Sequence, residues 1–113
     1  MSYLKRAREV FDIELAAVKA VRSQLTKSFD EAVGLIASTL AKRRKIVVLG
    51  VGKSGNIGRK IAATFTSTGS PAVLLDTVDA MHGDLGILND GDILLALSYS
   101  GETDELINLL PAI

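Results

Sequence analysis

Three short apolar runs limit the folds open to this chain more than any other feature of its sequence. They cover residues 46–50 (IVVLG), 72–75 (AVLL) and 93–97 (ILLAL). Each run is too short for a helix and lacks polar side chains throughout, which is typical of parallel strands buried on both faces. The sequence therefore predicts an α/β fold built on a doubly wound parallel sheet of flavodoxin-like order.

The segment between the first two runs predicts the helix that connects them. Residues 54–69 (SGNIGRKIAATFTSTG) have helical spacing. The apolar face of this helix is expected to consist of Ile57, Ile61, Ala62 and Phe65. Its length suits the crossover between parallel strands, so residues 46–75 predict a βαβ unit. A further helix is expected after the third run, beginning near Thr103.

Two helices are predicted ahead of the first strand. In residues 3–25 apolar side chains recur at helical spacing among charges, with no Gly or Pro. A stripe with a spacing of seven residues is formed by Leu4, Phe11, Val18 and Leu25. Such a stripe suits packing against another helix, so a partner chain is expected there. The second helix is expected to run to about Arg43 and to be capped by Ser28 or Asp30.

These patterns divide the chain into a helical region, residues 1–44, and the first part of an α/β domain, residues 45–113. Three strands are fewer than the roughly five or more that open parallel sheets usually have. Either a second copy covers the free edge of the sheet, or the chain is the first part of a longer protein. We favour the longer protein.

Composition excludes several kinds of site. The chain has no Cys and one His, so disulfides, Cys-based zinc sites and multi-histidine metal sites are excluded, and neither a metal nor a cofactor is expected. No apolar run approaches the about 18 residues of a membrane span, and the N-terminus mixes charges where a signal peptide needs an apolar stretch. A cytoplasmic location without membrane contact is therefore expected.

The net charge is zero, but the charges are unevenly placed. Residues 1–45 carry ten Lys and Arg against five Asp and Glu, and residues 46–113 carry three against eight. Four of the basic residues form the run 42–45 (KRRK). This run could contact nucleic acid or an acidic membrane, or it could form the last turn of a helix, where cations stabilise the macrodipole. We favour the helix end because the run has no aromatic neighbours, and we expect no nucleic-acid partner.

A glycine-rich segment follows the first predicted strand. Gly50, Gly52 and Gly55 are spaced G-x-G-x-x-G, and Asp76 lies 21 residues after the third glycine. This spacing is typical of a dinucleotide site with the acid on the ribose. More generally, glycine lets backbone N–H groups approach phosphate at a helix N-terminus, and Lys53 adds a full charge. Tight packing of strand against helix with nothing bound is the alternative.

A second polar segment follows the third predicted strand. It contains Ser98, Ser100, Gly101 and Thr103 ahead of the next helix. One hydroxyl would suffice as an N-cap, whereas three hydroxyls and a glycine suit an anion. In a sheet of order 2-1-3 the first and third strands are neighbours, so both polar segments border one crevice. A single phosphate held there fits a sugar monophosphate better than an extended dinucleotide.

The motifs GKSG, STG-P, HGDLG and S-x-SGE-x-x-E follow one another within residues 40–113. In these motifs and their spacing the chain resembles a sugar isomerase (SIS) domain, and most of all those of the arabinose 5-phosphate isomerases. The resemblance implies an intramolecular oxidoreductase that interconverts D-arabinose 5-phosphate and D-ribulose 5-phosphate through an enediol, for lipopolysaccharide biosynthesis. It also implies that the missing C-terminal part completes the site, and that the protein is a homo-oligomer, a dimer or tetramer.

The same resemblance assigns roles to individual residues. The catalytic residues would be Lys53, His82 and Glu105. The sugar phosphate would be bound by Gly52, Ser54, Ser98, Ser100, Gly101 and Thr103. By the same resemblance, Asn56 stands where arabinose 5-phosphate isomerases often have His, and Asp79 stands where they usually have Glu. Either change could alter the choice of substrate.

Two other functions stay open. SIS-like domains also occur in regulatory proteins, so the chain could sense a sugar phosphate without catalysis; the candidate proton carriers His82 and Glu105 favour an enzyme instead. A dinucleotide-binding domain is the third interpretation, and it depends on the glycine spacing and on Asp76 alone.

Overall fold

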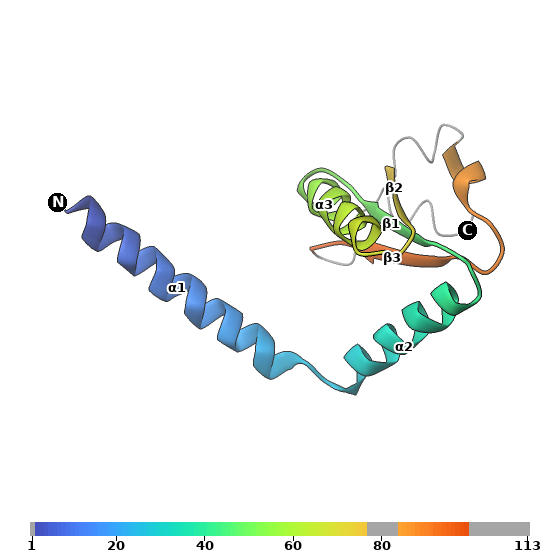
Figure 1. Cartoon of the computed structure of the whole chain (residues 1–113). Helices are drawn as coiled ribbons and strands as arrows, with labels where there is room; N and C mark the ends of the chain where they lie inside the picture. Colours follow the sequence, from blue (N-terminus) through green and yellow to red (C-terminus); the bar gives the residue numbers. More distant parts are fainter. Residues whose placement is uncertain (1, 77–83, 100–113) are drawn as a thin grey trace. The chain divides into compact units, whose positions relative to one another are not determined.

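The computed structural model describes residues 2–76 and 84–99 of the chain (Figure 1). The chain forms two compact units that divide after Val33. The elements in chain order are α1 (Tyr3–Gln24), α2 (Lys27–Ala41), β1 (Ile46–Gly50), α3 (Lys53–Ser67), β2 (Ala72–Asp76), the short 3-10 helix η1 (Asp84–Ile87) and β3 (Ile93–Leu97).

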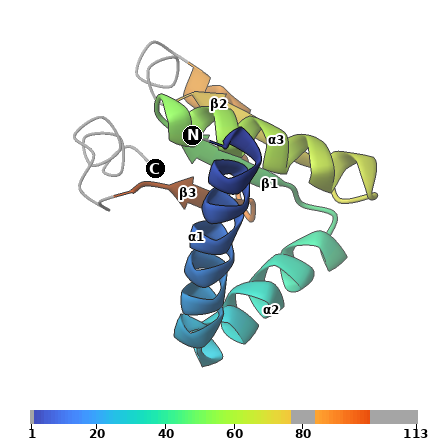
Figure 2. The same cartoon turned by 90° about the vertical axis from the view of Figure 1, so that its left-hand side faces the viewer.

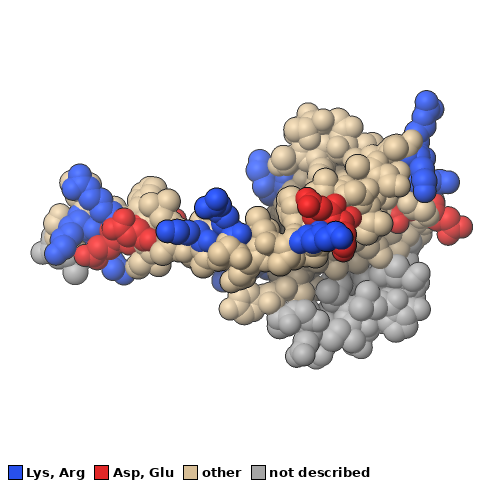
Figure 3. Space-filling model, turned by 90° about the horizontal axis from the view of Figure 1, so that it is seen from below, with Lys and Arg blue, Asp and Glu red and all other residues tan. Residues whose placement is uncertain are grey.

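Helix α1 makes up most of the N-terminal unit and agrees with the helix predicted for residues 3–25. It begins after Ser2, whose Oγ accepts a hydrogen bond of 3.2 Å from the Lys5 N–H. Figure 3 shows basic and acidic side chains intermixed at this end of the chain. None of the residues of α1 is buried. Its stripe of apolar side chains is between 57% and 68% exposed at Leu4, Phe11, Val18 and Leu25.

Helix α2 begins two to four residues earlier than its predicted caps require. Its first residue is Lys27, and the Ser28 N–H donates to Thr26 Oγ1 at 3.4 Å. Ser28 and Asp30 therefore lie inside the first turn, and the prediction that one of them caps the helix is wrong. Thr26 caps it instead because a hydroxyl just ahead of the first helical residue reaches the orphan N–H groups.

The end of α2 is a Schellman turn built without glycine. The Arg44 N–H donates to the Thr39 carbonyl at 3.2 Å, and the Arg43 N–H donates to the Leu40 carbonyl at 3.0 Å. Arg43 has φ 58°, the left-handed conformation that glycine adopts more easily. The basic run of residues 42–45 thus follows the helix, whereas the sequence predicted it in the last helical turn.

The three strands form one parallel sheet in the order β2-β1-β3, which confirms the predicted order. Gly50 at the end of β1 lies opposite Asp76 of β2 and Leu97 of β3. All of β1 is buried, whereas most of β2 and β3 is half-buried. Figure 2 shows β1 between its neighbours with α3 alongside them. The predicted βαβ unit is therefore confirmed.

The core occupies both faces of the sheet. On one face, Val47, Leu49 and Leu75 pack with Val73, Leu88 and Leu94. On the other face, Ile46, Val48 and Ala62 pack with partly buried side chains of α2, α3 and the strands. The crossover helix α3 lies on this second face, and Leu88 of the second crossover lies on the first, as a doubly wound sheet requires.

Helix α3 packs on the sheet through small residues. Its buried residues are Gly55, Gly58 and Ala62, and a Cβ added at Gly58 would lie 2.9 Å from Val48 Cγ1. The prediction that Ile57 belongs to the core face is wrong, since this side chain is 58% exposed. Ile57 lies about 100° around the helix from Gly58, outside the face that approaches β1 so closely.

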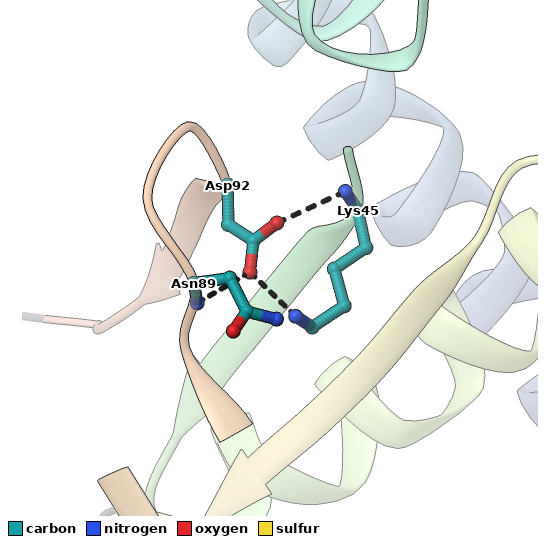
Figure 4. Close-up of polar contacts among 3 residues, drawn as sticks. All are labelled: Lys45, Asn89 and Asp92. Atoms are coloured by element: carbon teal, nitrogen blue, oxygen red, sulfur yellow. Dashed lines mark hydrogen bonds and ion pairs between the residues drawn. The ribbon is translucent and has the colours of Figure 1, made fainter. Parts of the chain in front are cut away.

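An ion pair joins the amino ends of β1 and β3 (Figure 4). Asp92, whose side chain is 4% exposed, accepts hydrogen bonds from Lys45 Nζ at 2.5 Å, the Lys45 N–H at 3.2 Å and the Asn89 N–H at 2.9 Å. Burial works against the charged carboxylate, but these hydrogen bonds outweigh it and lower the pKa of Asp92.

Asp92→Asn should lower the free energy of unfolding by about 2 kcal/mol at neutral pH, because Lys45 loses its counter-charge. A carboxyl whose pKa is depressed by folding stabilises the protein above its unfolded pKa, and this is lost as the pH falls through the folded pKa. The difference between the two proteins should therefore shrink below about pH 4. Urea unfolding across this pH range measures it.

Asp90→Asn is the matched control, because Asp90 is exposed and makes no ion pair within the described residues. We expect its effect to stay within about 0.5 kcal/mol at every pH. Equal effects of the two substitutions would contradict the stabilising role of the Lys45–Asp92 pair.

Candidate functional site

The candidate site lies at the carboxyl edge of the sheet. We call residues 50–55 the glycine loop and residues 98–103 the serine loop. The glycine loop starts at Gly50, and the serine loop starts directly after Leu97, which is the register partner of Gly50 on the neighbouring strand. Neighbouring strands lie about 4.8 Å apart, so the two loops leave the sheet side by side. This confirms that both begin at one edge.

The glycine loop turns tightly because two of its glycines are in contact. A Cβ added at Gly50 would lie 2.8 Å from the Gly55 nitrogen and from the Ser54 carbonyl carbon and oxygen. A Cβ added at Gly55 would lie 3.1 Å from the Gly50 oxygen. Gly52, between them, has φ 58° and ψ −124°, a conformation that essentially only glycine adopts. The backbone therefore requires glycine at Gly50 and Gly52, whereas a Cβ at Gly55 would make a tight contact.

This turn leaves backbone donors pointing out of α3. The Ser54 and Gly55 N–H groups donate to the Val51 carbonyl at 3.1 and 3.4 Å. The N–H groups of Gly52 and Lys53 make no hydrogen bond within the part of the chain that the structure describes. Two available N–H groups at the positive end of a helix can bind an oxyanion. Val51, whose carbonyl shapes the turn, carries no sequence signal because any residue supplies a carbonyl.

Lys53 occupies an electrostatically unfavourable position. It is the first residue of α3, and the first turn of this helix contains no acidic residue. Its side chain is exposed and makes no ion pair among the described residues. A cation at a helix N-terminus repels the positive end of the macrodipole. A bound anion would relieve this repulsion, so the placement favours a binding role.

The other described site residues lie at the same edge. Ser54 is half-buried in the first turn of α3, and Ser98 is half-buried directly after β3. Asn56 is exposed on α3. The remaining predicted site residues, and Asp79 with them, lie outside the described residues; the site residues concerned are His82, Ser100, Gly101, Thr103 and Glu105.

The described residues offer little else in the way of ligands. Within residues 2–76 and 84–99, no cluster of three His, Asp or Glu side chains could hold a metal ion. No helix in these ranges combines the length and apolar character needed to cross a membrane. Asp76 ends β2 opposite Gly50, as the dinucleotide interpretation also requires, so this geometry alone does not separate the two kinds of phosphate ligand.

Comparison with known proteins identifies the family of the chain. The SIS domain family model matches residues 39–113. The arabinose 5-phosphate isomerase KdsD of Francisella tularensis is 37% identical over 112 residues, which cover 99% of this chain and 34% of that protein. Fold and site together thus define the class of protein: a parallel α/β domain with two polar loops at the carboxyl edge of its sheet. The chain belongs to the SIS domain family.

Solved structures agree with this assignment. A structure from Bacteroides fragilis matches with a TM-score of 0.92 and 39% identity, over 98% of this chain and 57% of that chain. An Escherichia coli CFT073 protein in complex with arabinose 5-phosphate matches with a TM-score of 0.81 and 37% identity, over 99% of this chain and 60% of that chain. The chain spans about a third of the length of the curated relatives it matches.

Proposed function

We propose that this chain carries the phosphate-binding part of an aldose-ketose isomerase that interconverts D-arabinose 5-phosphate and D-ribulose 5-phosphate. One observation carries the proposal. The glycine loop begins at Gly50 and the serine loop begins directly after Leu97, and these two residues are register partners on neighbouring strands. Relatives named arabinose 5-phosphate isomerase support the choice of substrate. The sugar's phosphate would accept hydrogen bonds from both loops.

The reaction needs a proton moved between C1 and C2 through an enediol. A base removes the C2 proton of the aldose, the C1 carbonyl oxygen gains a proton, and returning a proton to C1 while the C2 hydroxyl loses its own gives the ketose. Glu105 and His82 are our candidates for the proton transfers. Lys53 would hold the phosphate or stabilise the charge of the enediolate. The sequence predicts a helix from about Thr103, whose N-terminus would favour the Glu105 anion, so this role for Glu105 would need desolvation to oppose that effect.

The phosphate would be held by groups of both loops. The N–H groups of Gly52 and Gly101 and the hydroxyls of four side chains are the proposed donors; the hydroxyls belong to Ser54, Ser98, Ser100 and Thr103. These neutral donors bind a dianion without needing a metal, and backbone N–H groups at a helix N-terminus are suited to this.

The direct test is to incubate the product of the complete gene with arabinose 5-phosphate and to assay ribulose 5-phosphate. We expect turnover. Tight binding without turnover would instead identify a sugar-phosphate sensor. Tight binding of NAD(H) with no binding of the sugar phosphate would favour the dinucleotide interpretation and overturn the proposal.

Glu105→Gln should lower the turnover number by at least about a hundredfold, because the amide cannot accept the proton, while the KM for the sugar phosphate changes little. Steady-state kinetics measures both values. Asp104→Asn, the neighbouring acid, is the matched control and should keep its turnover within about threefold. Unchanged turnover in Glu105→Gln would exclude Glu105 as the base.

We also propose that the protein acts in the cytoplasm as a homo-oligomer, a dimer or tetramer, held in part by α1. Support comes from the heptad-spaced stripe, which is exposed at Phe11 and Val18 (67% and 68%). Phe11→Lys should reduce the mass measured by sedimentation, whereas Ala20→Lys, on the opposite side of α1 by helical periodicity, should leave it unchanged. A wild-type monomer at assay concentrations would contradict this.

A further inference from the structure

The amino edge of the sheet, opposite the glycine loop, carries a pocket of its own. It has a volume of about 400 Å³ and lies between the end of α2, the start of β1 and the turn before β3. Its apolar lining is Leu40 and Pro71, and its polar lining comprises Arg43, Arg44, Lys45, Asn89 and Asp92. The length of β1 separates it from the glycine loop by roughly 13 Å.

The positive charge in this pocket is not neutralised. Lys45 is paired with Asp92, but Arg43 and Arg44 make no ion pair with any described residue. Asp90, the other carboxylate of the turn, does not line the pocket. The side-chain amide of Asn89 makes no hydrogen bond within the described residues either. Two arginines and an asparagine therefore line one pocket, and their side-chain donors make no hydrogen bond or ion pair with a described residue.

The backbone that carries the two arginines is fixed by hydrogen bonds. Arg43 follows α2 in a left-handed conformation, and the Arg43 and Arg44 N–H groups donate to the Leu40 and Thr39 carbonyls near the end of the helix. These two carbonyls are therefore hydrogen-bonded within the chain, and the negative end of the helix dipole has to be outweighed by the two arginine charges. Gly91 has φ 89°, and a Cβ added there would lie 3.1 Å from Arg44 Nε, so the Arg44 side chain lies against a turn that only glycine leaves open. Asp92 holds the same turn through the Asn89 N–H.

From this geometry we infer that the pocket at the amino edge binds a small molecule carrying a phosphomonoester, at a site separate from the glycine loop. Arginine forks match the oxygens of a phosphate, and a cavity of this size exceeds a lone phosphate but suits a small metabolite. A long polyanion fits less well, because the site is concave and the chain as a whole carries no net charge. The inference does not depend on the proposed reaction.

The test uses the product of the complete gene and measures the rate at which an arginine-selective dicarbonyl reagent modifies each arginine, by peptide mass spectrometry. Inorganic phosphate and glycerol 3-phosphate should each slow modification of Arg43 and Arg44 saturably, by at least about fivefold, as mass action predicts near saturation. Arg22, an exposed arginine of α1, should react at an unchanged rate.

Matched variants distinguish a specific binding site from a general effect of positive charge. Arg44→Gln should raise the phosphate concentration that half-protects Arg43 by about tenfold or more, since a charge-assisted hydrogen bond is lost. Lys42→Gln removes the same charge from a residue outside the pocket lining, and it should change this half-protecting phosphate concentration by less than about twofold. Circular dichroism confirms that both variants fold.

Four results would overturn the inference: unprotected arginines, equal protection by sodium chloride at the same ionic strength, equal effects of the two variants, or protection by a DNA duplex but not by phosphate. Each is independent of isomerase activity, so a failure here leaves the proposed function standing. Conversely, loss of the isomerase proposal would leave protection at Arg43 and Arg44 unaffected.

Discussion

Gly50→Ala should lower the free energy of unfolding by about 3 kcal/mol or more. The added Cβ would lie 2.8 Å from three backbone atoms of Ser54 and Gly55, and backbone cannot move aside as a flexible side chain can. Relief requires the N-terminus of α3 to separate from β1, which also opens the glycine loop. Chemical denaturation measures the stability, and binding of the sugar phosphate should weaken in parallel.

Gly34→Ala is the control for the same chemical change. Gly34 is exposed within α2 and an added Cβ meets nothing within 4 Å. Here alanine should raise the free energy of unfolding by up to about 1 kcal/mol, since glycine is a poor helix former. If Gly50→Ala were as mild as this control, the close contact between β1 and α3 would be refuted.

Lys53→Met should separate activity from stability. Removing the cation from the positive end of α3 should leave the free energy of unfolding unchanged or raise it by up to about 0.5 kcal/mol. The same change should lower kcat/KM for arabinose 5-phosphate by about a hundredfold to a thousandfold, because a charge that stabilises the phosphate or the enediolate is gone. Kinetics and denaturation on one preparation test both halves.

Lys60→Met supplies the comparison for this prediction. Lys60 is an exposed lysine two turns further along α3 and makes no ion pair among the described residues. Its replacement should alter kcat/KM by less than about twofold. Wild-type activity in Lys53→Met, or an equal loss in Lys60→Met, would remove Lys53 from the site.

Periodicity was sufficient to predict the sheet. Continuous apolar runs of four or five residues have few alternatives to buried parallel strands, and the helix between the first two runs favours a right-handed crossover. The predicted strand order came from assigning the sheet to the doubly wound, flavodoxin-like class. The wrong assignment of Ile57 has a physical cause, because the face of α3 that approaches β1 most closely is made of Gly55, Gly58 and Ala62. Hydrophobicity ranks isoleucine above glycine and cannot reveal a close backbone approach.

Local backbone geometry was harder to predict. Thr26 is followed by Ser28 and Asp30, which are equally plausible capping residues by type. Only the direction of the backbone at Lys27 decides which of the three caps α2. Arg43 in a left-handed turn contradicts the usual preference for glycine. At the candidate site, the spacing of the glycines correctly predicted where the chain turns between β1 and α3. This worked because Gly52 has a positive φ and Gly50 leaves no room for a Cβ. The roles of His82 and Glu105 remain predictions from resemblance.

A crystal structure of the complete gene product with arabinose 5-phosphate tests the central claim most directly. The account predicts one phosphate whose oxygens lie within about 3.2 Å of donors from both loops, among them the Gly52 or Lys53 N–H and the Ser98 hydroxyl. A phosphate bound by one loop only, or bound away from the carboxyl edge of the sheet while the sugar is turned over, would contradict it.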